Sequence, residues 1–142
     1  MDIKLLITEA LKAREFSYSP YSEFQVGAAL LTKDGQVFTG CNIESASYTP
    51  SNCAERTAFF KAVSQGVRVF SAIAVVGGPK GAKELDYCTP CGVCRQVMME
   101  FCDPKTFQVI VAKNPEEYQV FTLEEILPMG FGPKDLEKEA RR

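Results

Sequence analysis

Three cysteines and one glutamate carry the clearest chemical signal in the sequence. Cys53 and Glu55 are separated by a single alanine, and Cys91 and Cys94 are three residues apart. Residues three apart lie on one face of a helix, so both sulfurs of the second pair can approach the same point. A helix N-terminus also stabilises thiolates through its unpaired N–H groups and its dipole. Three thiolates with an open fourth position are typical of a catalytic zinc, whereas structural zinc sites use four protein ligands.

Two predicted helices would carry these residues at their first turns. One helix is expected over residues 53–64, where Ser51-Asn52 supplies side chains of the kind that cap helices. The other is expected over residues 90–101, with Thr89 as its cap and a proline at its first position, where the missing N–H costs nothing. If both helices begin at one edge of a sheet, all three thiolates meet at that edge.

The rest of the chain predicts the sheet that positions these helices. Asp34-Gly35 between two apolar segments indicates a hairpin turn. Strands are expected at residues 24–32, 36–43, 69–76 and 107–112, a loop at 77–81, and further helices at 3–17, 123–127 (capped by Thr122) and 133–141. Alternating strands and helices with one hairpin predict an α/β fold: a three-layer α/β/α sandwich with a central mixed β-sheet, in a single domain spanning residues 1–142.

Composition narrows the class of partner. The 142 residues carry a net charge of −2, and the only basic block is Arg141-Arg142. Nucleic-acid phosphates are bound by clustered Lys and Arg, so no nucleic-acid partner is expected. No apolar run reaches the ~20 residues of a membrane span, and the charged N-terminus does not resemble a signal peptide. We therefore expect no membrane partner and a soluble, cytoplasmic protein.

Two residue counts restrict the chemistry. The six cysteines of a cytoplasmic protein are not expected to form structural disulfides. The sequence contains no histidine, which excludes a histidine general base, a Ser/His/Asp triad and a Cys/His dyad within one chain. Proton transfer must then depend on a carboxylate, a lysine, a tyrosine, a thiol or a metal-bound water.

The two cysteine segments together resemble a known family signature. Cys53-Ala54-Glu55 followed by Pro90-Cys91-Gly92-Val93-Cys94 is similar to the signature of the zinc-dependent deaminases. Because a cysteine stands where the other branch of that superfamily has a histidine, the chain resembles the small, all-cysteine cytidine deaminases. This resemblance implies one Zn²⁺ per subunit, bound by Cys53, Cys91 and Cys94. It also implies that a zinc-activated hydroxide attacks C4 of cytidine or deoxycytidine while Glu55 shuttles the protons, giving uridine or deoxyuridine in pyrimidine salvage.

The resemblance extends to two segments outside the metal-binding signature. Residues 24–29 (Phe-Gln-Val-Gly-Ala-Ala) resemble the family's first strand, which implies that Phe24 lines the pyrimidine pocket. Residues 40–44 (Gly-Cys-Asn-Ile-Glu) resemble its nucleoside-binding segment, which implies that Asn42 and Glu44 bind the ribose 3′-hydroxyl. A site that hydrogen-bonds a hydroxyl discriminates strongly against analogues that lack it. A small nucleoside is therefore the implied substrate.

Further roles follow from the same resemblance. The backbone around Ala54 and Cys91 is implied to read the amide edge of the base. Phe131 is implied to reach into a neighbouring subunit's pocket, in a homotetramer whose active sites lie at subunit interfaces. Three thiolates leave a bound Zn²⁺ with a net negative charge, so positive groups are needed to withdraw density from sulfur. Arg56 is the candidate for this role, because the family's matching arginine bonds to the ligand sulfurs, and Gln96 is expected to orient part of the same shell.

Other interpretations of the cysteines stay open at this point. A lone Cys-x-x-Cys can be a thioredoxin-like redox pair, but that motif gives no role to Thr89-Pro90 or to Cys53-Ala54-Glu55. A closed structural zinc site would need a fourth ligand, for which Cys88 is the best placed and Cys41 the second. Otherwise Cys41 and Cys102 are expected to pack as small buried hydrophobic residues.

Three competing functions also fit parts of the sequence. One is a deaminase that acts on a cytosine-bearing antibiotic, which would share the metal motif but not the segments at 24–29 and 42–44. A deaminase of nucleotides or polynucleotides would need cationic residues near the motifs, and the flanking segments have few. A zinc-stabilised scaffold without activity is the alternative outside the enzymes, and it would tolerate the loss of Glu55.

Overall fold

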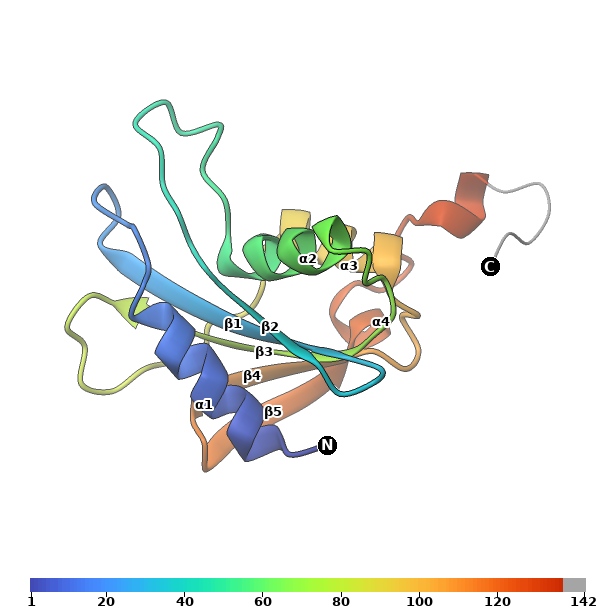
Figure 1. Ribbon diagram of the computed structural model, residues 1–142, viewed down its shortest axis with the longest axis horizontal. Coiled ribbons are helices and arrows are strands. Elements are labelled where there is room, and N and C mark those ends of the chain that lie inside the picture. Colours follow the sequence, from blue (N-terminus) through green and yellow to red (C-terminus); the bar gives the residue numbers. More distant parts are fainter. Residues whose placement is uncertain (137–142) are drawn as a thin grey trace.

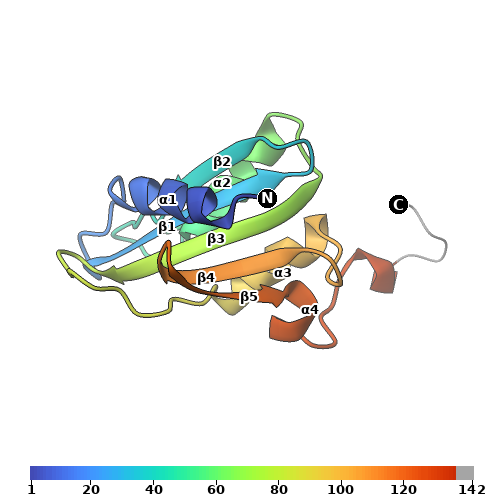
Figure 2. The ribbon, with the colours of Figure 1, turned by 90° about the horizontal axis from the view of Figure 1, so that it is seen from below.

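A computed structural model describes residues 1–136 and contains a five-stranded sheet with helices on both faces (Figures 1 and 2). Its elements are α1 (Ile3–Arg14), β1 (Phe24–Thr32), β2 (Val37–Cys41), α2 (Ala54–Ser64), β3 (Phe70–Pro79), α3 (Gly92–Phe101), β4 (Gln108–Asn114), β5 (Glu117–Thr122), α4 (Leu123–Ile126) and a 3-10 turn, η1 (Pro133–Leu136). The strand order is β2-β1-β3-β4-β5, and β3 with β4 is parallel while the other neighbouring pairs are antiparallel. The predicted three-layer α/β/α sandwich with a mixed sheet is confirmed.

The sheet separates two hydrophobic cores. Helix α1 covers one face, where Ile7 and Ala10 pack with the small residues of the strands, and α2 and α3 cover the other face, where Phe59 and Met98 pack (Figure 1). Strand β3 lies at the centre of the sheet and contributes to both cores, with Ile73 and Val75 in one and alternate residues in the other. Burial on both faces explains why its sequence is an almost uninterrupted apolar run.

Two glycines allow helices to approach the sheet at backbone distance. A Cβ at Gly27 of β1 would lie 2.0 Å from the carbonyl oxygen of Ala10 in α1. A Cβ at Gly40 of β2 would lie 2.4 Å from the carbonyl oxygen of Ala54 in α2. Because no side chain fits in either gap, these two glycines set how closely α1 and α2 pack. Gly40 in particular fixes the first turn of α2, where the cysteine motif begins.

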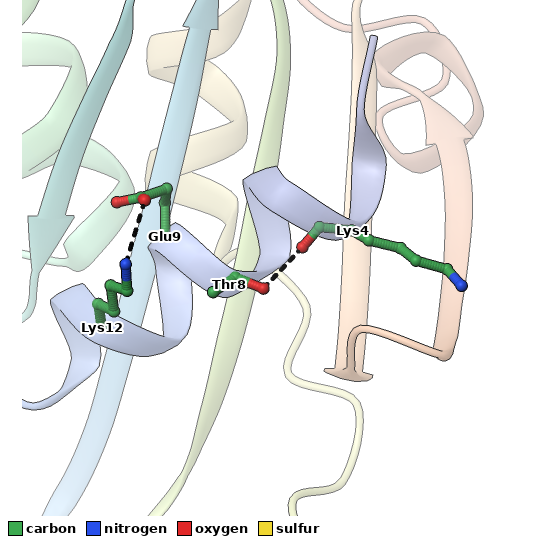
Figure 3. A network of polar contacts seen from close by, with 4 residues as sticks. All are labelled: Lys4, Thr8, Glu9 and Lys12. Atoms are coloured by element: carbon green, nitrogen blue, oxygen red, sulfur yellow. Dashed lines mark hydrogen bonds and ion pairs between the residues drawn. The ribbon is translucent and has the colours of Figure 1, made fainter.

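Polar side chains of α1 contact one another along the helix (Figure 3). Lys12 Nζ lies 3.6 Å from Glu9 Oε1, and the Thr8 hydroxyl donates to the carbonyl of Lys4 at 2.9 Å. Exposed ion pairs of this kind contribute little to stability, so α1 is held to the sheet by its apolar face. Within residues 1–136, none of the helices combines the length and apolar character needed to cross a bilayer.

The two helices of the cysteine motifs begin later than predicted. Cys53 is the N-cap of α2, and Cys91 is the N-cap of α3, so neither Ser51-Asn52 nor Thr89 caps a helix. The Asn52 amide instead donates to the hydroxyl of Thr57 at 3.2 Å. Neither cysteine makes a side-chain capping hydrogen bond. The first N–H groups of both helices therefore remain free to stabilise thiolates.

Two strands differ from the prediction: the end of β3, which contains glycines, and β5, which lies at the edge of the sheet. β1 matches residues 24–32, but β3 continues past residue 76 because Gly77 and Gly78 pair with Val26 and Gln25 of β1. The predicted loop at 77–81 is therefore partly strand. The prediction missed β5 altogether, since this short edge strand has no buried residue and alternates polar and apolar residues only over 117–120.

The remaining boundaries differ by short segments. Helix α1 ends at Arg14 rather than at residue 17, because the chain turns there so that Tyr18 can bridge Ile43. Strand β2 is shorter than residues 36–43 for the same reason, since Ile43 leaves the sheet to make this bridge. The Thr122 cap of α4 is confirmed, with a full capping box. Of the helix predicted at 133–141, residues 133–136 form the 3-10 turn and the others lie outside the described residues.

Candidate active site

The first turns of α2 and α3 bring three thiols to one point. The sulfurs of Cys53, Cys91 and Cys94 all lie within 4.8 Å of one another. Cys53 Sγ is 3.7 Å from Cys91 Sγ, which is 3.5 Å from Cys94 Sγ. A tetrahedral zinc with Zn–S bonds of about 2.3 Å separates its sulfurs by about 3.8 Å. The three thiols therefore fit a zinc ion in both chemical type and spacing, and all three are free of disulfides.

The charges around the cluster favour a thiolate on Cys53. Contacts with Cys94 and with the Arg56 guanidinium lower the pKa of Cys53 below its usual range, although partial burial opposes them. Arg56 Nη2 donates to Cys53 Sγ at 3.3 Å. Arg56 Nε is buried and has no hydrogen-bond partner within the described part of the chain, so a second donor lies close to the cluster. Arg56 is therefore placed to offset negative charge on the sulfurs.

Cys88 is not a member of this cluster. The group of sulfurs within metal-binding distance of one another contains Cys53, Cys91 and Cys94 and does not include Cys88 or Cys41. Cys88 packs against β3, where its Sγ lies 2.8 Å from the position that a Cβ on Gly77 would take. Burial raises the pKa of the Cys88 thiol to about 11, so it is protonated at neutral pH. Among residues 1–136, no fourth thiol closes the site.

Glu55 lies beside the thiols and is 4% exposed. Burial raises the pKa of its carboxyl to about 7. A carboxyl with a pKa near neutrality can both accept and release a proton, which is the property required of a proton shuttle. Its place in the first turn of α2 follows directly from its position two residues after Cys53.

The cluster opens onto a cleft of about 270 Å³. Its lining residues come from β1, the segment after β2, the start of α2 and the segment before α3: Val26, Asn42, Glu44, Ser51, Asn52, Cys53, Ala54, Glu55, Arg56, Cys88, Thr89 and Cys91. Most of the site residues expected from the sequence are thus brought together around one cavity, with Cys94 buried behind it. Phe24, Gln96 and Phe131 are not among the lining residues; Phe24 is 38% exposed and Phe131 is 55% exposed.

Two residues of α3 next to Cys94, Arg95 and Gln96, make contacts that the sequence analysis did not predict. Arg95 Nε donates to the carbonyl of Pro90 at 2.8 Å, and its Nη1 donates to the carbonyl of Ile126 at 2.6 Å. Gln96 Nε2 donates to the carbonyl of Phe131 at 2.7 Å rather than to the thiol cluster. Arg95 therefore ties the start of α3 to the end of α4, and Gln96 ties it to the segment that follows α4. The basic side chain of Arg95, directly after Cys94, was the one sequence feature that could have indicated these contacts.

Comparisons with known proteins define the class of this chain. A family model described as the cytidine and deoxycytidylate deaminase zinc-binding region matches residues 1–111. The chain is 48% identical to the cytidine deaminase of Sporosarcina psychrophila over all of both chains. It is 52% identical to the cytidine deaminase of Halalkalibacterium halodurans, over 96% of this chain and 98% of that one.

Solved structures agree with the sequence comparisons. The crystal structure of cytidine deaminase from Burkholderia pseudomallei superimposes with a TM-score of 0.82 at 48% identity, covering 92% of this chain and 100% of that one. That of the Mycobacterium tuberculosis enzyme superimposes with a TM-score of 0.76 at 35% identity, covering 93% of this chain and 98% of that one. The class is that of the hydrolytic deaminases, and the protein is an enzyme. The chain belongs to the cytidine and deoxycytidylate deaminase family.

Proposed function

We propose that this enzyme is zinc-dependent and hydrolyses the exocyclic amine of cytidine and deoxycytidine, giving uridine or deoxyuridine and ammonia in pyrimidine salvage. The observation that carries the proposal is the cluster of Cys53, Cys91 and Cys94 next to the buried Glu55 at one end of the cleft. The relatives named as cytidine deaminases over the full length of the chain support the substrate class.

Cys53, Cys91 and Cys94 would hold one Zn²⁺ per chain, since soft thiolates favour zinc over magnesium or calcium. A zinc held in this way supplies a polarised water as the nucleophile. Glu55 takes a proton from the attacking water and delivers protons to ring N3 and to the departing amine. One water is consumed and one ammonia is released, so the shuttle ends the cycle as it began. The raised pKa of Glu55 suits both transfers.

The cleft favours a nucleoside over a nucleotide. Of the residues that line it, Arg56 alone is cationic, and its guanidinium is already engaged with Cys53. A substrate phosphate would therefore meet no free positive charge there. In our proposal Asn42 and Glu44 bind the sugar 3′-hydroxyl, the backbone of Ala54 and Cys91 reads the base, and Phe24 lies against the pyrimidine.

We also propose a single domain over residues 1–142, a cytoplasmic location and a homotetramer with active sites at subunit interfaces. Two exposed apolar side chains support the assembly, because a subunit interface would bury them. Met129 is fully exposed and Phe131 is 55% exposed. The Gln96 contact holds the backbone of this segment in place. Phe131 would then complete the pocket of a neighbouring subunit.

Purified protein is expected to convert cytidine to uridine in a zinc-dependent manner. The conversion is followed by the fall in ultraviolet absorbance of the cytosine ring, before chelation, after chelation and after zinc is restored. Activity should be lost with the metal and should return with it. If fully metallated protein leaves cytidine and deoxycytidine unchanged, the proposed substrate class is wrong.

Replacing Arg56 with alanine is expected to weaken zinc binding or turnover by about 10- to 100-fold, the usual effect of losing a group that supports metal ligands. The reason is the loss of its hydrogen bond to Cys53 Sγ and of its positive charge beside the thiolates. Zinc affinity is measured by competition with a chromogenic chelator, and turnover with cytidine. Arg68→Ala, at an exposed position that does not line the cleft, is the matched control. Unchanged zinc affinity and turnover in Arg56→Ala would refute the role.

A further inference from the structure

The side-chain amide of Asn42 is held in one orientation. Its Oδ1 accepts from the backbone N–H of Val26 at 2.9 Å and from the hydroxyl of Ser17, and its Nδ2 donates to the carbonyl of Phe24 at 2.7 Å. The reversed amide would place a donor against the Val26 N–H and an acceptor against the Phe24 carbonyl, so the network excludes it. The second Nδ2 hydrogen makes no bond to the described residues, and it is free for a ligand because Asn42 lines the cleft. Asn42 therefore offers a ligand a donor and no acceptor.

The carboxylate of Glu44 is held with equal precision. Its Oε1 accepts from the backbone N–H groups of Tyr21 and Ser22 at 3.0 and 3.1 Å, and its Oε2 accepts from the Ser22 hydroxyl at 2.5 Å. These bonds, with that from the Ser22 hydroxyl the largest cause, lower the pKa of Glu44. A carboxylate accepts about four hydrogen bonds, so these three leave one position for a ligand. Glu44 therefore offers an acceptor and no donor.

The Ser22 hydroxyl donates its proton to Glu44 and accepts from a backbone N–H group. The oxygen accepts from the backbone N–H of Phe24 at 3.1 Å, and the proton goes to Glu44. The same side chain thus joins Glu44 to the first residue of β1. Glu23 between them has a φ of 55°, in the left-handed region, so the turn at residues 21–24 is tight and its shape depends on these contacts.

We infer that Ser22 is a positioning residue, which holds Glu44 as the acceptor of a donor–acceptor pair completed by Asn42 and so sets the enzyme's selectivity for a free hydroxyl on the sugar. This inference rests on the proposed function. A hydroxyl is the small group that accepts from Asn42 and donates to Glu44 at once. A sugar carbon without this hydroxyl leaves both Asn42 and Glu44 without a hydrogen-bond partner, and unpaired polar groups weaken binding of such a substrate.

The test compares two substrates in two proteins. Wild-type enzyme is expected to prefer cytidine over 3′-deoxycytidine by at least about 100-fold in kcat/KM. Ser22→Ala should lower kcat/KM for cytidine about tenfold, because the Glu44 carboxylate loses the hydrogen bond that holds it in the orientation that accepts from the sugar hydroxyl. For 3′-deoxycytidine, which has no hydroxyl to meet Glu44, the same substitution should change kcat/KM less than about twofold. The preference for cytidine should thus fall about five- to tenfold.

Two further variants exclude a general effect on folding. Ser22→Thr keeps a hydroxyl at this exposed position and should restore the preference to within about threefold of the wild type. Ser64→Ala removes a serine whose hydroxyl bonds to the Lys61 carbonyl at 2.8 Å, at the opposite end of α2 from the cleft, and should leave both substrates unaffected.

The outcomes separate this inference from the proposed function. Equal losses on both substrates in Ser22→Ala would mean that Ser22 merely stabilises the fold, and unchanged rates on both would mean that Glu44 needs no such support; either overturns the inference while the function stands. Wild-type protein that turns over neither substrate overturns the function, and the inference with it. A loss confined to cytidine, with rescue by Ser22→Thr, supports the positioning role.

Discussion

The substitution Glu55→Gln is expected to reduce kcat for cytidine by about 10⁴-fold while the zinc content of the purified protein stays unchanged. Glu55 does not belong to the thiol cluster, so its loss removes no metal ligand. Glutamine keeps the shape of the side chain but cannot take up and release the proton that the reaction moves, and general acid–base catalysis contributes up to about 10⁴-fold. Turnover is followed by absorbance, and zinc is measured by elemental analysis of the same preparation.

The matched control for this substitution is Glu100→Gln. Glu100 is an exposed residue of α3 that does not line the cleft, so the same chemical change there should alter neither quantity. Retained turnover in Glu55→Gln would exclude Glu55 as the shuttle and would favour a zinc-stabilised scaffold or a different base. Loss of zinc together with activity would mean that Glu55 holds the metal site together rather than moving protons.

The second large effect is expected from Cys91→Ser, which should lower the zinc content from about one per chain to nearly none and abolish turnover. A serine hydroxyl is neutral at pH 7 and is a poor replacement for a thiolate in a zinc site. Cys91 is exposed, so the substitution removes little core packing and the metal-free chain should keep its helices. Elemental analysis, circular dichroism and turnover of one preparation give the three quantities.

Two other cysteines provide the comparison. Cys41→Ser changes a half-buried thiol outside the cluster, and Cys88→Ser changes the cleft thiol that would have been the fourth ligand of a closed site. Both variants should keep about one zinc per chain. Zinc lost from Cys88→Ser but kept in Cys91→Ser would show that the ligand set proposed here is wrong.

Local sequence rules predicted those parts of the fold that depend on local contacts. Strand β1 could be placed to the residue because an apolar segment ends at the Asp34-Gly35 turn. The starts of α2 and α3 were misplaced because the capping rules favour Ser, Thr and Asn, whereas both helices use a cysteine as N-cap. The exposed edge strand β5 was missed because its neighbour β4, rather than its own apolar pattern, holds it in the sheet.

In the candidate site, too, the contacts between residues close in sequence could be predicted and those between distant residues could not. The spacing of Cys91 and Cys94, and of Cys53 and Glu55, already indicated metal ligands beside a carboxylate, because these neighbours share a helix turn. The roles of Ser22 and Arg95 could not be predicted, since their partners are distant in sequence. Ser22 reaches Glu44 across 22 residues, and Arg95 reaches Ile126 across 31. No periodicity in the chain encodes such contacts, which depend on the assembled fold.

The glycine contacts beneath α1 and α2 also restrict how this sequence can diverge. Any replacement at Gly27 or Gly40 adds at least a methyl group where a carbonyl oxygen already stands at 2.0 or 2.4 Å. A single mutation at either position must therefore shift the backbone of the facing helix, and at Gly40 that helix is α2, whose N-cap is Cys53. By contrast, the solvated face of α1 around Thr8 can accept many exchanges (Figure 3). Neutral drift in this enzyme should thus be concentrated on its outer helix surface, and a lineage could lose these glycines only together with compensating changes in the helix above them.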